Sequence, residues 1–304
     1  MASRNQSIYG LDLYKDAVCM AQYFPEERSI ASVVINPLPE NESDWWESLS
    51  TELTKLAAEL KISGQDVICS LPSEWAVIKK IACDKNEPDI EDTIRWEISQ
   101  QVLGSLDDYA FDHQEILSSD ELFRYFLVAA FRSSAVKRVS KLMRSTKLNP
   151  VVVDIDIFAL INVLETNYEE KTAVPSIIIM GDNEKLKLVL TRNGEFIDFQ
   201  IVNFQNETED FSPCLTAIQN AVAALSKVNK SVVGDGTVDL YCTGPLFSNT
   251  ELLAYLQQNL PNIEILDPFR TIACHAEIPE EDLRRYAPQL AVAVGLSVRG
   301  AMEV

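Results

Sequence analysis

Two stretches with the same order of features constrain the fold of this chain most. Residues 8–23 contain two short apolar runs around a polar turn at 14–16, a pattern that predicts a tight β-hairpin. Residues 176–202 contain an apolar strand, a turn at 181–183 and two further strands joined at Asn193 and Gly194. Because helix and strand patterns alternate after each stretch, we expect a duplicated α/β fold with two related halves around a cleft.

Composition narrows the class of protein. The 304 residues suffice for two domains, and 26 Lys and Arg against 46 Asp and Glu give a net charge of −20. Such an excess argues against nucleic acid as the main ligand, because nucleic-acid binding needs a positive surface. The six cysteines occur singly, which favours buried thiols in a cytoplasmic protein over a disulfide framework. We expect neither a signal peptide nor a membrane span, because no run approaches about 18 apolar residues.

The first half begins as an alternation of strands and helices. A third strand over 29–35 precedes a helix that Asp44 would cap and whose leucines recur at helical spacing. A buried strand over 67–71 follows and ends at Pro72. The half then closes with a helix over 136–147, a strand over 151–153, a helix over 157–164 and a polar linker over 165–172.

Residues 79–131 have a different character. Asp89 would cap a helix in which Ile90, Ile94, Ile98 and Val102 form one apolar stripe. Strands over 109–117 and 122–130 would follow as a hairpin. A helix and a hairpin between α/β elements predict a small inserted subdomain.

The second half continues the alternation of elements. After its first strands we expect a helix around Leu215 to Leu225, a turn at 234–236 and a strand over 237–242. A leucine-rich helix and a strand over 263–266 come next. The last helix, 288–298, is nearly all Ala, Val and Leu, so we expect it to be buried between layers.

Several motifs in this order resemble one family. They are Leu71-Pro72-Ser73-Glu74, Ile94-Arg95-Trp96-Glu97, Asn149-Pro150-Val151-Val152-Val153-Asp154, Leu266-Asp267-Pro268-Phe269 and Tyr286-Ala287-Pro288. Together they resemble the type IV pilus assembly protein PilM, which shares the superfold of actin, the Hsp70 chaperones and FtsA. The resemblance implies an actin-like ATPase fold with a first half over 8–172, containing the insertion 79–131, and a second half over 173–304. PilM and FtsA carry their extra subdomain at this place, whereas other actin relatives carry theirs elsewhere. The position of the insertion therefore favours the PilM family over the sugar kinases.

The resemblance also implies a nucleotide cleft, but its motifs are degenerate here. The first phosphate turn keeps Gly10, Asp12 and Lys15, while Tyr14 replaces a glycine and would obstruct a phosphate. The second turn keeps Gly181 without the preceding carboxylate, and Asp182 is displaced beyond it. The adenosine turn keeps Thr243 and Gly244 but loses two further glycines. We therefore expect either no cofactor or weakly bound ATP with Mg²⁺, no catalytic residue and no metal ligand. Asp12 is interpreted as a structural acid that accepts hydrogen bonds from neighbouring backbone N–H groups.

PilM resembles a peptide-binding platform, and its partner is the short cytoplasmic N-terminal tail of the inner-membrane protein PilN. On this chain the candidate tail-binding residues are Arg95, Trp96, Ser99, Gln100, Tyr109 and Phe111. A structural alternative, in which Trp96 packs beneath the hairpin, stays open. Trp45, Trp46 and Trp75 are expected in the core.

The resulting hypothesis is a cytoplasmic scaffold of type IV pilus biogenesis, a pseudo-ATPase held at the inner membrane through a PilN-like partner. One alternative is an active actin-like ATPase that binds Mg-ATP, and another is a cytoplasmic component of a type II secretion system. A homo-oligomer is possible. The basic stripe over 137–147 is either the solvated face of an amphipathic helix or a face turned toward acidic lipid headgroups or a partner that seeks a basic surface. Its basic residues are Lys137, Arg138, Lys141, Arg144 and Lys147.

Overall fold

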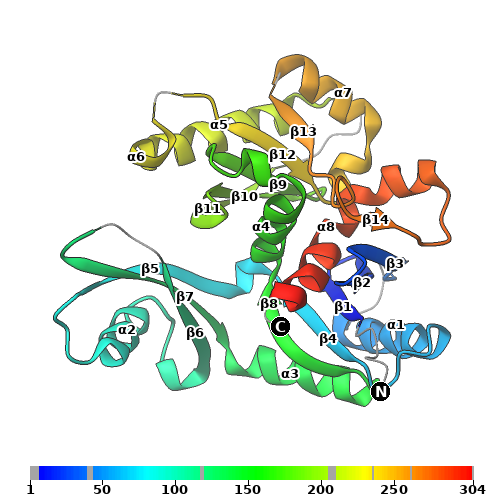
Figure 1. Cartoon of the computed structure of the whole chain (residues 1–304), viewed down its shortest axis with the longest axis horizontal. Helices are drawn as coiled ribbons and strands as arrows, with labels where there is room; N and C mark the ends of the chain where they lie inside the picture. Colours follow the sequence, from blue (N-terminus) through cyan, green and yellow to red (C-terminus); the bar gives the residue numbers. More distant parts are fainter. Residues whose placement is uncertain are drawn as a thin grey trace.

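Two large β-sheets, a central pair of helices and a small third sheet make up the molecule (Figure 1). The computed structural model describes residues 7–39, 44–116, 120–204, 210–234, 236–260 and 262–302. Asp235 of the predicted turn and residue 117 of a predicted strand lie outside these ranges.

The first large sheet has the strand order β14-β3-β2-β1-β4-β8. β1, β2 and β3 form an antiparallel meander, and β4 and β8 run parallel to β1. The predicted first hairpin and third strand are confirmed. The strands are β1 (Ile8–Leu13), β2 (Ala17–Phe24), β3 (Ser29–Pro37), β4 (Asp66–Leu71), β8 (Asn149–Ile155) and β14 (Ala273–Cys274).

The second large sheet repeats this arrangement with the order β11-β10-β9-β12-β13. Here β9, β10 and β11 form the antiparallel meander, and β12 and β13 run parallel to β9. The predicted duplicated α/β fold is therefore confirmed. The strands are β9 (Ser176–Gly181), β10 (Lys185–Arg192), β11 (Glu195–Asn203), β12 (Asp239–Thr243) and β13 (Ile263–Ile265).

Helices cover both sheets. In α1, the Asp44 side chain accepts a hydrogen bond from the backbone N–H of Trp46 at 2.9 Å, which satisfies one free donor of the first turn. Leucines 49, 53 and 56 then face the core. The helices are α1 (Trp45–Glu59), α3 (Ser133–Ser145), α4 (Asp156–Asn167), α5 (Ser212–Val228), α6 (Lys230–Val233) and α7 (Thr250–Asn259), with short 3₁₀ turns η1 (Ser73–Trp75), η3 (Glu169–Lys171) and η4 (Pro245–Ser248).

The prediction of a polar linker over 165–172 is wrong. α4 continues to Asn167, and η3 follows almost at once. Between them Tyr168 is only 3% exposed, and its hydroxyl accepts a hydrogen bond from the N–H of Asp267 at 2.9 Å. A buried aromatic anchor inside a polar run gives no periodic signal, so sequence patterning misses it.

The inserted subdomain contains one strand more than predicted. β5 (Ala76–Asp84), β7 (Phe123–Arg132) and β6 (Tyr109–Ile116) form a sheet in the order β5-β7-β6. The helix α2 (Ile90–Ser99) and the turn η2 (Leu106–Asp108) complete the subdomain, and α2 packs Ile94 and Ile98 against the sheet. Val102 lies beyond the helix, so the apolar stripe is shorter than expected. In Figure 1 this subdomain projects sideways from the body.

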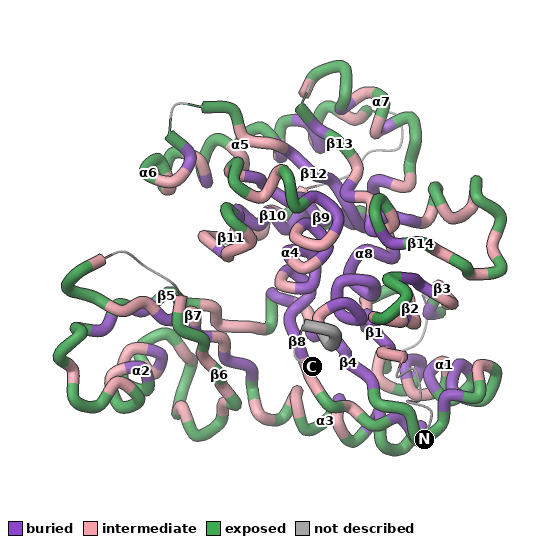
Figure 2. Tube along the Cα trace, viewed as in Figure 1, coloured by how far each residue is buried: buried purple, intermediate pink, exposed green. Residues whose placement is uncertain are grey.

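The last helix, α8 (Glu280–Met302), begins eight residues before the predicted start and contains Pro288 in its interior. It packs on β1 and β2 of the first sheet, and β14 pairs with β3 of the same sheet. The end of the predicted second half, 173–304, therefore packs on the first sheet. Figure 2 shows buried residues concentrated where α4 and α8 lie between the large sheets, as predicted for the last helix.

Two glycines allow these helices to approach their neighbours closely. A Cβ atom on Gly10 would lie 2.1 Å from the carbonyl oxygen of Ala293 in α8. A Cβ atom on Gly295 would lie 1.9 Å from the carbonyl oxygen of Ala159 in α4. Since real Cβ atoms do not come this close to backbone, β1, α8 and α4 can hold their spacing only with glycine at both positions.

We predict that Gly295→Ala lowers the free energy of unfolding by about 1–3 kcal/mol, because the methyl group forces α8 away from α4. This loss would occur although alanine favours an isolated helix over glycine. The measurement is urea denaturation followed by circular dichroism. Gly236→Ala is the control, since the nearest atom to its Cβ would be 3.9 Å away. Equal midpoints for Gly295→Ala and the parent would contradict the packing argument.

Candidate functional site

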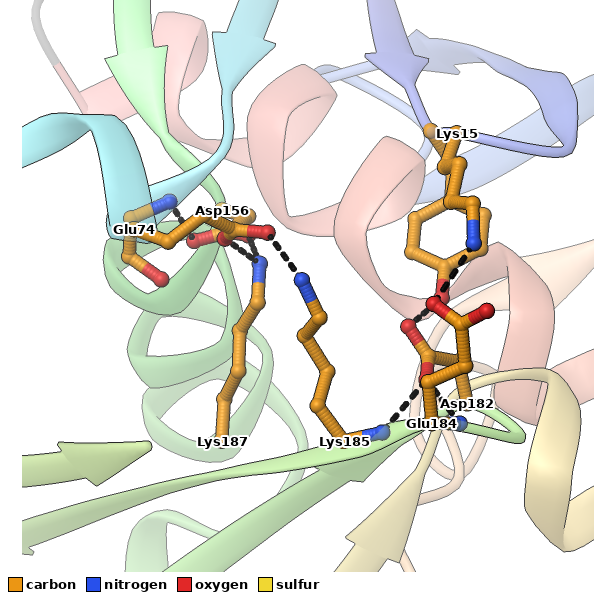
Figure 3. Close-up of polar contacts among 9 residues, drawn as sticks. Lys15, Glu74, Asp156, Asp182, Glu184, Lys185 and Lys187 are labelled. Carbon is orange, nitrogen blue, oxygen red and sulfur yellow. Dashed lines mark hydrogen bonds and ion pairs between the residues drawn. The ribbon is translucent and has the colours of Figure 1, made fainter. Parts of the chain in front are cut away.

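Charged side chains from both halves meet in the cleft between the large sheets (Figure 3). The first half contributes the β1–β2 turn, η1 and the start of α4, and the second half contributes the β9–β10 turn and β10. The cavity that remains has a volume of about 30 Å³. Its charged and phenolic lining residues are Asp12, Tyr14, Lys15, Glu74, Asp156, Asp182, Lys185 and Lys187.

Lys187 is the central cation of this cluster. Its side chain is 4% exposed, and its ammonium group forms ion pairs with Glu74 and, at 2.5 Å, with Asp156 (Figure 3). Burial alone would lower the pKa of Lys187, but the attraction of Asp156 and Glu74 raises it above its ordinary value. Lys187 therefore stays protonated at neutral pH and joins β10 to two carboxylates of the first half.

The two carboxylates are themselves held in position. Asp156 accepts hydrogen bonds from the N–H groups of Ser73 at 3.0 Å and Ile157 at 2.7 Å, at the N-terminus of α4 where the helix dipole favours a negative charge. Glu74 also pairs with Lys185 at 3.2 Å. Although burial raises the pKa of Glu74, the charge of Lys187 outweighs this effect and lowers it overall. Glu74 is thus stabilised as an anion.

Two further contacts cross the mouth of the cleft. The Tyr14 hydroxyl donates to Asp182 at 2.6 Å, and Lys15 pairs with Glu184 at 2.7 Å. The other oxygen of Asp182 accepts the N–H groups of Glu184 and Lys185, each at 2.7 Å. Tyr14 and Lys15 therefore join the β1–β2 turn to the β9–β10 turn.

Asp12 lies at the base of the cluster and is 7% exposed. The Ser70 hydroxyl donates a hydrogen bond to it at 2.8 Å. The expectation that backbone N–H groups satisfy Asp12 is therefore wrong, since the partner that the structure shows is a side chain of the neighbouring strand β4. Burial raises the pKa of Asp12 to about 7, and the Ser70 hydrogen bond offsets only part of this effect.

The remaining predicted cleft residues serve packing in this structure. Gly244 (φ +91°) donates its N–H, and Thr243 its hydroxyl, to the carbonyl of Pro288 in α8, both at 2.8 Å. A Cβ atom on Gly244 would lie 2.6 Å from the carbonyl oxygen of Gly181. Gly181, Thr243 and Gly244 thus lie against each other and α8, apart from the cavity that Asp12 and Lys15 line.

The predicted tail-binding residues lie on α2, just beyond its end and on β6, and Arg95 joins the helix to the strand. Trp96 is 62% exposed, so the alternative in which it packs beneath the hairpin is wrong. The Arg95 guanidinium stacks on the Phe111 ring at 5.1 Å, and Arg132 stacks on Tyr109 at 5.0 Å. Hydrogen bonds order the end of the helix, because Ser99 donates to the Trp96 carbonyl and Gln100 donates to the Ser99 hydroxyl.

The other tryptophans form a cluster that the sequence does not reveal. The ring centroids of Trp45 and Trp46 are 4.7 Å apart, and those of Trp45 and Trp75 are 5.9 Å apart. Trp75 is 41% exposed, so the prediction that it lies in the core is wrong. α1 and η1 are distant in sequence, and only the folded first half brings these rings together.

Three features of the described residues bear on the chemistry. Within them, no group of three or more His, Cys, Asp or Glu side chains is arranged to hold a metal ion. None of the helices in those ranges is long and apolar enough to cross a membrane. A larger open groove of about 610 Å³ lies between β11 and α5, but its lining contains no charged side chain.

Comparison with known proteins identifies the family. A family model described as type IV pilus assembly protein PilM matches residues 10–190, more than half of the chain. The chain belongs to this family. No curated protein sequence matches it.

Solved structures share its fold over nearly the whole chain. A structure titled PilM-PilN type IV pilus biogenesis complex matches with a TM-score of 0.75 and 19% identity, covering 98% of this chain and 99% of that one. The cytoplasmic domain of EpsL, an inner-membrane component of the Vibrio cholerae type II secretion system, matches with a TM-score of 0.52 and 9% identity over 98% and 95% of the two chains. A Bacteroides thetaiotaomicron protein of unknown function with an actin-like ATPase fold matches with a TM-score of 0.56 and 12% identity over 87% and 92%. The predicted actin-like fold is thus confirmed.

The raised pKa of Asp12 makes stability depend on pH. Since the folded-state pKa is about 7 and the ordinary value is 3.8, the folded protein binds more protons than the unfolded chain between these values. Stability contributed by the protonated carboxyl is therefore lost as pH rises from about 4 to 7. We predict that Asp12→Asn removes this loss. The free energy of unfolding of the variant, relative to that of the parent, should therefore rise by about 2–3 kcal/mol from pH 5 to pH 8.

Urea denaturation of both proteins at the two pH values measures the effect. The exposed Asp66 provides the control, because Asp66→Asn also removes a carboxylate but from the surface. An Asp12→Asn variant whose stability follows the pH dependence of the parent would show that Asp12 does not titrate in this range.

Proposed function

We propose that this chain is a cytoplasmic scaffold of type IV pilus biogenesis that binds the N-terminal tail of a PilN-like inner-membrane protein and does not turn over ATP. The observation that carries the proposal is the full-length likeness to the structure of a PilM-PilN complex, together with membership of the PilM family. On this proposal the chain reaches the membrane through its partner.

The surface of α2 and β6 supports tail binding by its chemistry. Trp96 offers a large exposed ring, and the Arg95 guanidinium is positioned over the Phe111 ring before a peptide arrives. Exposed aromatic and arginine side chains are the usual anchors of protein interfaces. The nearby Ser99 and Gln100 can pair with the backbone of an extended peptide. We place the tail on this surface.

We predict that Trp96→Ala weakens binding of a fluorescent peptide with the partner's N-terminal sequence by at least about tenfold, because the largest exposed anchor is lost. Fluorescence anisotropy gives the dissociation constant. Leu122→Ala is the matched control, since Leu122 is an exposed apolar residue of the same subdomain beside β7 rather than on α2. If the Trp96→Ala variant and the parent bind the peptide with equal affinity, the tail does not bind at this surface.

The contents of the cleft support the absence of ATP turnover. A cavity of about 30 Å³ is far smaller than the several hundred Å³ that a nucleotide-sized ligand fills. A triphosphate would have to displace Tyr14 from Asp182 and separate Lys187 from its carboxylates. Separation of a buried ion pair costs several kcal/mol, which the nucleotide would have to offset through motifs that have lost half of their glycines.

We predict that calorimetric titration of the protein with Mg-ATP gives a dissociation constant weaker than about 100 μM. An ATP-binding sugar kinase of the same superfold, titrated in the same buffer, checks that binding is detectable. A micromolar dissociation constant for this chain would reject the pseudo-ATPase and favour the alternative, an active actin-like ATPase.

The second candidate is a cytoplasmic component of a type II secretion system. The likeness to the cytoplasmic domain of EpsL favours it, but that TM-score of 0.52 is well below the 0.75 of the PilM structure. The pilus role is therefore the better supported of the two.

A further inference from the structure

Helix α3 carries a basic face on an acidic protein. Lys137, Lys141 and Arg144 lie on the side of the helix opposite to its buried residues, and all three are exposed. The helix contains no acidic residue, although Asp and Glu outnumber Lys and Arg by 46 to 26 in the chain. Arg138 and Lys147, also exposed, extend the face on its flank and beyond its end.

The positive charge of this face is largely uncompensated. Arg138 pairs with Asp44 at 3.6 Å, but within the described ranges the side chains of Lys137, Lys141 and Arg144 form no ion pair or hydrogen bond. Residues 137–145 span about 12 Å of helix, at 1.5 Å per residue, and Lys147 follows just beyond the helix end. Five cations along this segment, on a chain of net charge −20, indicate attraction to an extended anionic surface.

The tryptophan cluster described above adjoins the basic face. Arg138 joins the two, because its guanidinium stacks on the Trp46 ring at 4.4 Å. Trp75, the most exposed ring of the cluster, lies next to Trp46 with centroids 6.3 Å apart. The Trp45 indole donates its N–H to the carbonyl of Lys15 at 3.1 Å. Partly exposed indoles beside cations combine the two side-chain types that favour the headgroup region of a membrane.

We propose that α3 and the cluster of Trp45, Trp46 and Trp75 bind directly to a membrane surface rich in anionic lipids. The basic face supplies long-range attraction, and the indoles enter the boundary between headgroups and acyl chains. This contact goes beyond the proposed function, in which only the partner's tail links the chain to the membrane. Each contact alone is weak, and the two together hold the chain only where partner and anionic lipid coincide.

Sedimentation with vesicles tests the proposal on the full chain without any partner. The parent should bind vesicles of phosphatidylcholine with 30% phosphatidylglycerol and not vesicles of phosphatidylcholine alone. Since each basic residue near an anionic surface contributes roughly fivefold in affinity, the triple variant Lys137→Gln, Lys141→Gln, Arg144→Gln should bind about 100-fold more weakly. Trp75→Ala should also weaken binding while leaving its dependence on salt unchanged, because it removes no charge.

The control variant removes the same charge from other exposed positions. Lys79→Gln, Lys227→Gln, Arg285→Gln should bind the anionic vesicles like the parent. Equal sedimentation of the parent with anionic and neutral vesicles would overturn the proposal, as would equal binding by the two triple variants. Binding of the basic face to an acidic peptide but not to vesicles would assign it to a protein partner and reject the membrane. Trp96→Ala should leave vesicle binding intact, so failure of tail binding is distinguishable from failure here.

Discussion

The buried ammonium group of Lys187 between Glu74 and Asp156 determines how the two halves of this protein face each other. A lysine that is 4% exposed is tolerated only where carboxylates replace the water it has lost. Both carboxylates belong to the first half and the lysine to the second. Opening of the cleft would therefore separate Lys187 from Glu74 and Asp156 and break both ion pairs. The electrostatic cost of separation thus favours one orientation.

The packing of α8 between the two halves also fixes their arrangement. In the interior of α8, Pro288 accepts hydrogen bonds from Thr243 and Gly244 of the second half, and the helix also packs on β1 of the first sheet. Gly295 lets it touch α4 directly, and α4 begins at Asp156. The helix pair therefore connects the glycine-dependent packing with the ion pairs of the cleft. In the proposed pseudo-ATPase, side chains of the protein itself fill the position between the halves that a nucleotide would otherwise occupy.

Much of the architecture follows from the sequence because it rests on local patterns. Short apolar runs separated by turns predict β1, β2, β9 and β10, and the helical spacing after Asp44 predicts α1. The start of α8 is missed because Pro288 resembles a helix start, while its carbonyl is in fact used by Thr243 and Gly244.

The centre of the candidate site is missed for a different reason. Lys185 and Lys187 alternate with leucines in β10, a pattern typical of a strand with one solvent-facing side. Only the tertiary fold places that side against Glu74, which is more than a hundred residues away. Asp12 and Trp96 were identified because motifs mark them, but motifs do not give their exposure.

The connection between the inserted subdomain and α3 links the two proposed surfaces. β7 ends at Arg132 and α3 begins at Ser133, so no loop separates the sheet of the subdomain from the basic helix. Arg132 itself stacks on Tyr109, one of the residues proposed to bind the tail. A peptide that emerges from a membrane and a helix that lies against that membrane must be close together, and this junction keeps them so. The ion pairs of Lys187 then link the second half to the half that carries both proposed surfaces.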